Sequence, residues 1–169
     1  MILESILTYH LIAGAILHGP PIQLRENIVA SNNDYRCAVR NLYHEGRGES
    51  ILGQAYIVKT VLNRVRDTKY PHSICKVIYQ NKQFSWTHQI PKNKQQVPNK
   101  TTSEKELLKQ LEALSTVVIW LDRLGWDFTQ GSKFYHSTKV KPNWDYRKLE
   151  KVQIVGNHVF YRDIRKENK

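Results

Sequence analysis

The chain has 169 residues, enough for one domain with a substantial core, and its hydrophobic fraction of 40% excludes a disordered chain. It carries 26 Lys and Arg against 15 Asp and Glu, a formal net charge of +11. Such a surface favours polyanionic partners: nucleic acid, anionic lipid or the acidic polymers of a bacterial envelope. Charge alone does not choose among them.

Residues 1–33 differ from the rest of the chain. Apolar pairs recur every four or five residues from Ile2 to Leu17, a spacing typical of an amphipathic helix. The same run could be an export or release signal, although no Lys or Arg precedes it. We expect an N-terminal extension over residues 1–33 and the main domain over residues 34–165.

The first helix of the main domain is predicted to begin near Tyr35, with N-cap candidates at residues 32–34. Gly46 and Gly48 are expected to end it, which places Glu45 in its last turn. The negative end of the helix dipole disfavours a charged carboxylate and raises its pKa. A raised pKa is what a general acid working near neutral pH requires.

Two more helices are predicted before residue 80. Apolar residues recur at helical spacing from Ile51 to Val65, and Ser50 is a candidate cap. This helix is expected to end near Arg66. Residues 73–79 predict a short third helix after the break at Tyr70-Pro71.

Residues 80–102 change in character, because they contain several lysines and no acidic residue. The pattern predicts an extended loop that is either functional or mobile. Its start contains Phe84-Ser85-Trp86, and a solvated loop has little reason to hold two aromatic residues. They are expected to anchor the loop or to line a cleft.

A long helix is predicted to open with a capping box of Ser103 and Glu106 and to close at Gly125. Trp120, within this helix, and Trp126, just after it, are expected to lie in the core.

The last part of the chain has β character. A short strand is predicted at residues 134–136, and residues 152–155 and 158–161 flank the two-residue turn Gly156-Asn157. The fold class is therefore α+β and mainly α, with a small C-terminal β-hairpin.

The cysteines and histidines say little about whether the chain holds a disulfide or a metal. Cys37 and Cys75 could form a disulfide outside the cytoplasm or could be two small buried residues. They lack the paired spacing of a zinc site, and the seven histidines are scattered without a His-Glu-x-x-His pattern. We expect no metal and no cofactor.

Glu45 and Glu49 frame the most informative string of the chain. Taken alone, Glu-Gly-Arg-Gly-Glu is typical of surface charge, and Glu49 could cap the next helix or pair with Arg47. Gln54, Asn63 and Arg64 are polar positions of the second helix, more suited to structural hydrogen bonds than to substrate contact.

A set of collinear motifs alters this interpretation. They are Tyr43-His44-Glu45-Gly46-Arg47-Gly48-Glu49, Gly53-Gln54, Val61-Leu62-Asn63-Arg64-Val65, Val77-Ile78-Tyr79-Gln80, Gln83-Phe84-Ser85-Trp86, Phe134-Tyr135-His136 and Gly156-Asn157-His158-Val159-Phe160-Tyr161. Together they resemble the core of the spore-cortex-lytic (SleB-type) cell-wall hydrolase family, over about residues 35–161. Position 46 is Gly where the family usually has Ala.

The resemblance implies a lysozyme-like, mainly helical domain that cleaves peptidoglycan as a lytic transglycosylase. It implies that Glu45 is the catalytic acid, with Glu49 and Gln54 supporting the site. Five further residues match family positions that suit a sugar-binding cleft: Phe84, Ser85, Trp86, Tyr135 and His136. Phe84 and Tyr135 could equally be core residues.

Other functions stay open at this stage. They are a muramidase-type hydrolase, an N-acetylmuramoyl-L-alanine amidase and a basic nucleic-acid-binding protein, although no nucleic-acid-binding motif is present. We expect a monomer that binds peptidoglycan strands, with anionic envelope polymers as further partners and no specific nucleic acid. We also expect the protein to act on the cell wall, from the periplasm or from outside the cell, and to be of phage endolysin origin.

Overall fold

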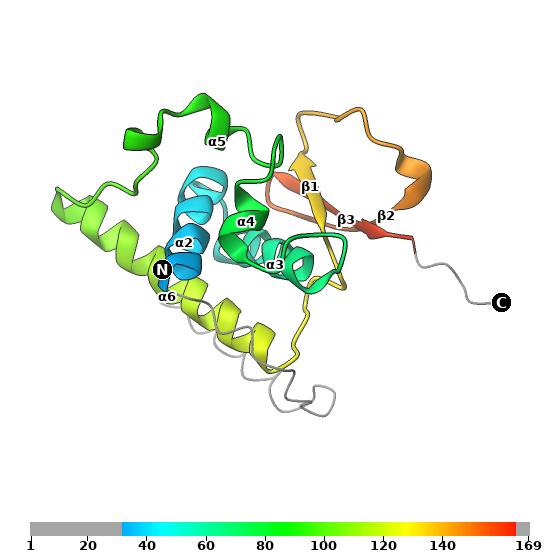
Figure 1. The fold of residues 1–169 in the computed structure, drawn as a ribbon, viewed down its shortest axis with the longest axis horizontal. Coiled ribbons are helices and arrows are strands. Elements are labelled where there is room, and N and C mark those ends of the chain that lie inside the picture. Colours follow the sequence, from blue (N-terminus) through cyan, green and yellow to red (C-terminus); the bar gives the residue numbers. More distant parts are fainter. Residues whose placement is uncertain (1–31, 165–169) are drawn as a thin grey trace.

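The helical part of the fold is built around α3 (Ile51–Arg66), most of whose residues are buried. In this computed structural model, which describes residues 32–164, α3 packs against α2 (Asn32–Gly46), α4 (Ile74–Ile78) and α6 (Thr102–Arg123). Figure 1 shows these helices on one side and a small sheet on the other. The predicted N-terminal extension lies, up to position 31, outside the residues that the structure describes.

Local capping signals explain two of the helix starts. The side chain of Ser50 accepts a hydrogen bond from the backbone of Gly53 at 3.2 Å, and α3 ends at Arg66, so both predicted limits are confirmed. Ser73 caps α4 in the same way by accepting from the backbone of Lys76. These caps satisfy N–H groups that have no partner within a helix.

The start of α2 differs from the prediction. The helix begins at Asn32 rather than near Tyr35, and the N-cap candidate Asp34 lies within its first turn. The Asp34 carboxylate accepts hydrogen bonds from Ser73 Oγ and from the backbone N–H of Cys75, both at 2.8 Å. The Asp34 side chain, which was expected to cap its own helix, is therefore hydrogen-bonded to residues that are distant in sequence.

Cys37 and Cys75 form a disulfide, with their Cα atoms 5.3 Å apart. This decides between the two alternatives that the sequence left open. The bond joins α2 to α4, and Cys37 also belongs to the hydrophobic core. Disulfides persist mainly in proteins that work in oxidising compartments outside the cytoplasm.

The capping box of α6 is shifted from the prediction. Thr101 and Glu104 form it, rather than Ser103 and Glu106: Thr101 Oγ1 accepts from the backbone of Glu104, and Glu104 Oε2 accepts from that of Thr101. Both pairs have the required spacing. The Glu104 carboxylate also accepts from the backbone of Lys100 at 2.8 Å, which favours the earlier start.

The buried face of α6 is more polar than predicted. Trp120 is 52% exposed, so its assignment to the core is wrong, and Trp126 is only partly buried. Asp122 is buried instead, and it binds Lys59 at 2.8 Å and Arg66 at 2.6 Å. A buried charge is tolerated only when it is paired in this way, and the two cations of α3 supply the pairing.

The segment between α4 and α6 is folded rather than extended. It contains the helical turns α5 (Trp86–Gln89) and η1 (Lys92–Lys94). Gln95 is buried there, and its Nε2 donates to the carbonyl oxygens of Thr87 and Ile90. A glutamine that satisfies loop carbonyls from the inside explains how such a polar sequence keeps a defined shape.

The sheet has the order β1 (Phe134–Ser137), β3 (His158–Asp163), β2 (Leu149–Val155), and both pairings are antiparallel. The predicted hairpin is confirmed around Gly156 (φ 56°) and Asn157, and β1 extends it to three strands. The α+β, mainly α fold class is confirmed. None of the helices within residues 32–164 has the length and apolar character needed to cross a membrane.

Candidate active site

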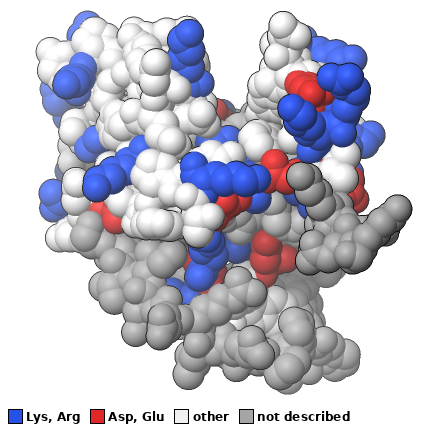
Figure 2. Space-filling model, turned by 45° about the vertical axis from the view of Figure 1, so that its right-hand side comes forward, with Lys and Arg blue, Asp and Glu red and all other residues white. Residues whose placement is uncertain are grey.

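An open groove of about 540 Å³ lies beside the end of α2, and Glu45 is part of its lining. The remaining lining residues come from two segments far apart in sequence: Lys82, Gln83, Phe84, Ser85, His88 and Gln89, then Val140 and Pro142. In Figure 1 the segment around α5 and the segment after β1 both lie at the upper end of the molecule. Figure 2 shows two lobes separated by a hollow, with Lys and Arg on both.

Glu45 is held by a single hydrogen bond from the sheet. The hydroxyl of Tyr135 donates to Glu45 Oε2 at 3.0 Å. Glu45 Oε1 accepts no hydrogen bond from the part of the chain that the structure describes. One carboxylate oxygen is therefore fixed, and the other is open to the groove.

The protonation of Glu45 is set by its surroundings. Burial raises the pKa of Glu45, while the hydrogen bond from Tyr135 and the nearby charge of Arg64 act in the opposite direction. The net shift is upward, as the sequence predicted. The main cause, however, is burial rather than the helix end.

Arg64 lies beneath the groove and does not reach into it. It is buried, its Nε donates to the carbonyl of Lys133 at 2.6 Å, and a terminal nitrogen donates to Gln83 Oε1 at 2.8 Å. Its guanidinium carbon lies 5.6 Å from the centre of the Phe84 ring. The sequence interpretation of Arg64 as a structural hydrogen-bond donor agrees with these contacts but missed its electrostatic effect on Glu45.

Glu49 is held in place by the hairpin. Its Oε2 accepts from the backbone of Asn157 at 3.1 Å and its Oε1 from the Asn157 side chain at 3.0 Å, with His158 Nδ1 at 3.6 Å. The Glu49 side chain is only 8% exposed. It does not pair with Arg47, which donates instead to the hydroxyl of Tyr43.

The ionisation of Glu49 contrasts with that of Glu45. Burial alone would raise the pKa of Glu49, but the two Asn157 hydrogen bonds and His158 outweigh it, so the pKa is lowered. A Cβ added at Gly156 would collide with Glu49 Oε2. A side chain at position 156 would therefore displace this carboxylate, and the positive φ of 56° also favours glycine there.

Gln54 connects the two helices on either side of the motif. Its Nε2 donates to the carbonyl oxygens of Gly46 and Glu49, at 3.2 Å and 3.3 Å. Gly46 is the last residue of α2, and its carbonyl also accepts from the backbone N–H of Glu49 at 3.0 Å. Gln54 thus fixes the turn that carries both glutamates.

The three residues of Phe84-Ser85-Trp86 occupy different places. Ser85 is exposed and lines the groove, whereas Phe84 is 3% exposed and contributes only an edge to it. Trp86 is 4% exposed and faces the core, where its Nε1 donates to Asn41 Oδ1 and its ring stacks on His44 at 4.4 Å. Trp86 therefore anchors the segment from within.

Tyr135 and His136 point to opposite faces of the sheet. Tyr135 packs toward the helices, beside Phe84 and Glu45, while His136 lies on the outer face. His136 Nε2 is 3.2 Å from the Tyr161 hydroxyl, and its ring lies 5.5 Å from that of Trp144. His136 is not among the residues that line the groove. Its contacts hold the segment after β1 against the sheet.

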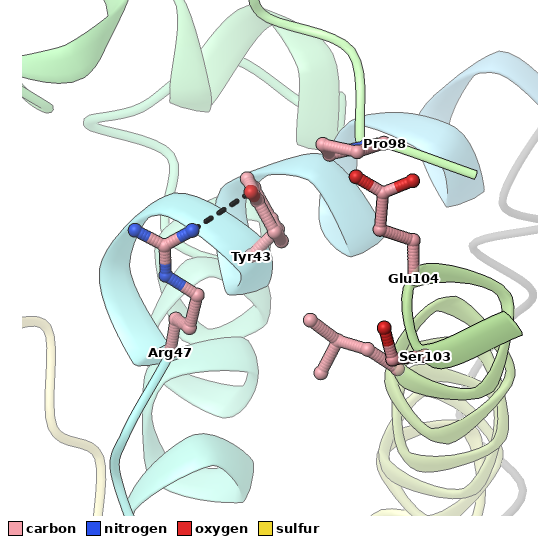
Figure 3. Close-up of a pocket in the computed structure, with 6 residues that line it drawn as sticks. Tyr43, Arg47, Pro98, Ser103 and Glu104 are labelled. Carbon is pink, nitrogen blue, oxygen red and sulfur yellow. Dashed lines mark hydrogen bonds between the residues drawn. The ribbon is translucent and has the colours of Figure 1, made fainter. Parts of the chain in front are cut away.

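A second, smaller cavity of about 260 Å³ lies between the end of α2 and the start of α6. It is lined by Tyr43, Arg47, Pro98, Ser103, Glu104 and Leu107 (Figure 3). Its carboxylate belongs to the α6 capping box and is already hydrogen-bonded. Among residues 32–164, no three His, Cys, Asp or Glu side chains come together in a way that could hold a metal ion.

Comparison with known proteins gives the family. Residues 48–161 match the family described as Cell Wall Hydrolase. The chain belongs to the cell wall hydrolase family. This confirms the membership that the motifs predicted and makes the chain a relative of cell-wall-lytic enzymes. The match begins just after Glu45, whose role therefore rests on the site itself.

Individual members of the cell wall hydrolase family show how far the similarity extends. The chain is 29% identical over 132 residues to the spore cortex-lytic enzyme of Bacillus subtilis (strain 168), covering 77% of this chain and 38% of that protein. It is 26% identical over 131 residues to the spore cortex-lytic enzyme of Bacillus cereus, covering 77% and 44%. The chain thus spans about two-fifths of the length of these relatives.

Solved structures of family members share the fold. The catalytic domain of the Bacillus cereus SleB protein superposes with a TM-score of 0.55 at 21% identity, covering 84% of this chain and 98% of that domain. The catalytic domain of the germination-specific lytic transglycosylase SleB from Bacillus anthracis gives 0.54 at 21% identity, covering 79% and 98%. At this identity the likeness concerns the fold.

Proposed function

We propose that the chain cleaves the glycosidic bond between N-acetylmuramic acid and N-acetylglucosamine in peptidoglycan, as a lytic transglycosylase with Glu45 as its acid and base. One observation carries the proposal. Among the described residues that line the groove, Glu45 is the one carboxylate, and its pKa is raised. A protonated carboxyl group facing a groove is suited to proton donation onto a glycosidic oxygen.

In the first step, protonated Glu45 donates its proton from the open oxygen to the oxygen of the scissile bond. The bond to C1 of the muramic acid breaks, and positive charge develops on that sugar. The neighbouring acetamido group of the sugar would help to carry this charge, so a second carboxylate is not required.

In the second step, Glu45 acts as a carboxylate. It takes the proton of the C6 hydroxyl, whose oxygen bonds to C1 and closes a 1,6-anhydro ring without consuming water. The hydroxyl of Tyr135 and the charge of Arg64 stabilise the carboxylate between the two steps. The same two groups therefore moderate the pKa and balance both roles of Glu45.

Glu49 is the nearest alternative for a hydrolytic mechanism, which would need a second carboxylate at a defined separation. Both Glu49 oxygens accept hydrogen bonds from Asn157, and the side chain is nearly buried. We assign Glu49 and Gln54 to support of the turn that carries Glu45. In the same proposal Ser85 and Phe84 contact the sugar. Tyr135, predicted to bind substrate, is not part of the groove lining and acts through Glu45, while Trp86 and His136 position the two groove walls.

The proposal also covers where the protein acts. The disulfide and the formal net charge of +11 suit a protein that acts outside the cytoplasm, on or near anionic envelope polymers. We place its action on the cell wall during bacterial lysis, as a monomeric, phage endolysin-like enzyme without a specific nucleic-acid partner. Peptidoglycan strands are the expected substrate.

Product analysis tests the reaction. Purified peptidoglycan is incubated with the wild type, with Glu45→Gln and with Glu106→Gln, a matched change on the exposed side of α6. We expect 1,6-anhydro-muropeptides from the wild type and Glu106→Gln only, identified by mass spectrometry. Reducing-end saccharides would instead indicate a muramidase, and released stem peptides an amidase. Equal activity in Glu45→Gln would overturn the assignment of the acid.

A further inference from the structure

Lys82 has an unusual backbone conformation for a residue in the groove lining. Its φ is 60°, in the left-handed region that L side chains other than Asn and Asp rarely adopt. Within residues 32–164, the only other non-glycine residue with positive φ is Gln130. An outlier of this kind in a functional groove points to a role for the side chain that it places there.

A neighbouring residue of the groove fixes this conformation. The backbone N–H of Lys82 donates to Nε2 of His88 at 3.0 Å, and both residues line the groove with Glu45. The next backbone N–H, of Gln83, donates to the carbonyl of Gln80 at 3.2 Å and closes the turn. The Cα–Cβ direction of Lys82 is therefore set by the fold.

The ammonium group of Lys82 has no acidic partner in the described part of the chain. Lys82 is exposed and takes part in no ion pair there. Residues 68–103 contain no Asp or Glu, and Glu45 is the one acid of the groove lining. On the opposite wall, the Lys141 ammonium lies over the Tyr146 ring at 5.4 Å. The groove thus offers one uncommitted cation beside its proton donor.

We propose that Lys82 binds a carboxylate of the stem peptide on the muramic acid, so that the groove selects glycan whose stem peptides keep their free carboxylates. This inference rests on the proposed function. The sugar backbone of peptidoglycan is uncharged, whereas the stem peptide is an acidic peptide attached to the same sugar ring whose C1 bond is cleaved. A carboxylate is therefore tethered to the sugar whose bond is cleaved, and a lysine on a flexible stem can meet it as a point charge.

The test compares two substrates: intact peptidoglycan, and the same material after the carboxyl groups of its stem peptides have been converted to neutral amides. The proteins are the wild type, Lys82→Met, Lys82→Arg, and Lys94→Met as a matched control on an exposed lysine of the same segment. Binding is measured by cosedimentation and cleavage by release of anhydro-muropeptides. Each is measured at low and high salt, because screening weakens an exposed charge pair.

We expect the wild type to prefer intact peptidoglycan, and Lys82→Met to weaken binding and raise KM for it by roughly 2- to 5-fold, as for an exposed charge pair. The change in KM should be lost on the amidated substrate, Lys82→Arg should restore the preference, and Lys94→Met should match the wild type. Lys82→Gly should lose the preference while its Tm stays equal or rises, because glycine suits positive φ.

The inference is overturned if the wild type shows no preference, or if Lys82→Met changes both substrates alike or neither. Its failure can be told apart from failure of the proposed reaction, because binding is read separately from products. A preference that depends on Lys82 without anhydro products would overturn the transglycosylase proposal alone. Anhydro products without that preference would overturn the assignment of Lys82 alone.

Discussion

The hydroxyl of Tyr135, on the first strand, lies 3.0 Å from Glu45 Oε2, in the last turn of α2, across 90 positions of sequence. Burial, together with the nearby Glu45, raises the pKa of Tyr135 well above its ordinary value, so the phenol remains a hydrogen-bond donor. A residue of the sheet thereby orients a carboxyl group on a helix and moderates the rise in its pKa. This relationship gives the proposed mechanism its most direct tests.

Replacement of Glu45 by Gln should separate activity from stability. Loss of the proposed general acid should lower the rate of glycan cleavage by about 10³-fold or more. Because the folded-state pKa of Glu45 is raised, its stabilising contribution is complete below the ordinary glutamate pKa and is lost as pH rises through the folded-state pKa. Neutral Gln avoids that loss, so its Tm at pH 7 should equal or exceed that of the wild type.

The gain in Tm should shrink when both proteins are compared at about pH 4, where wild-type Glu45 is also neutral. Thermal melts followed by circular dichroism across this range give the comparison. A Glu45→Gln protein that is less stable than the wild type at pH 7 would contradict the raised pKa.

Replacement of Tyr135 by Phe should change the pH profile. The lost hydrogen bond lowers the pKa of Glu45 in the wild type, so the pKa should rise further in the variant. Protonated Glu45 would then persist to higher pH, and the alkaline limb of kcat/KM should move upward. kcat should fall by about 10-fold, because the carboxylate formed after the first step loses a donor.

Tyr35→Phe is the control for the Tyr135 variant. The Tyr35 hydroxyl donates to the carbonyl of Glu112 at 3.0 Å, so that variant also loses one tyrosine hydrogen bond, but away from the groove. Its pH profile should match that of the wild type. An unshifted alkaline limb in Tyr135→Phe would show that this hydroxyl does not tune Glu45.

Replacement of Glu49 by Ala should loosen the hairpin turn. Two hydrogen bonds to Asn157 would be lost, at a cost of about 2 kcal/mol in the free energy of unfolding. The pKa of Glu49 is lowered in the folded chain, so its contribution is present above the ordinary pKa and disappears as pH falls through the folded-state value. Urea unfolding should show the gap to the wild type closing in acid.

The same variant tests the division of roles between the two glutamates. Because Glu49 is assigned to support, Glu49→Ala should slow cleavage without changing the chemical nature of the products. Glu49→Gln, which can still accept one of the Asn157 hydrogen bonds, should fall between Glu49→Ala and the wild type in stability. A switch in product type would identify Glu49 as a reacting group.

Reduction of the disulfide should destabilise the domain. Cys37 and Cys75 are 38 positions apart, and cross-linking a loop of that length lowers the entropy of the unfolded chain by an amount worth about 3–4 kcal/mol. Urea unfolding with and without a reductant measures the difference. The Cys37→Ala/Cys75→Ala protein should resemble the reduced wild type and should not respond to reductant. An unchanged wild type under full reduction would contradict the prediction.

Features that depend on neighbouring residues were predictable. The Ser50 cap, the end of α3 at Arg66 and the turn at Gly156 each follow from side chains within a few positions. The shifted capping box shows the limit of this reasoning, because Thr101 and Ser103 both have a glutamate three residues later. A contact with Lys100, outside the pattern, favours the first pair.

Features that depend on distant contacts were not predictable. Burial of Trp86 follows from a hydrogen bond to Asn41 and stacking on His44 in another helix, and nothing local distinguishes it from an exposed aromatic. Asp122 is buried because it forms ion pairs with Lys59 and Arg66 of α3, and Trp120 on the same helix is exposed. In both cases partners from another helix decided which side chain faces inward.

By itself, the sequence determined the helical frame, the hairpin, the family motifs and the place of Glu45 at a helix end, because each depends on short-range spacing. Only the tertiary structure decided how the two glutamates differ. Tyr135 holds one oxygen of Glu45 and leaves the other facing a groove, while Asn157 occupies both oxygens of Glu49. Burial outweighs the Tyr135 hydrogen bond and the Arg64 charge and raises the pKa of Glu45, whereas hydrogen bonds lower the pKa of Glu49, so the pKa values of two similar residues in one motif shift in opposite directions.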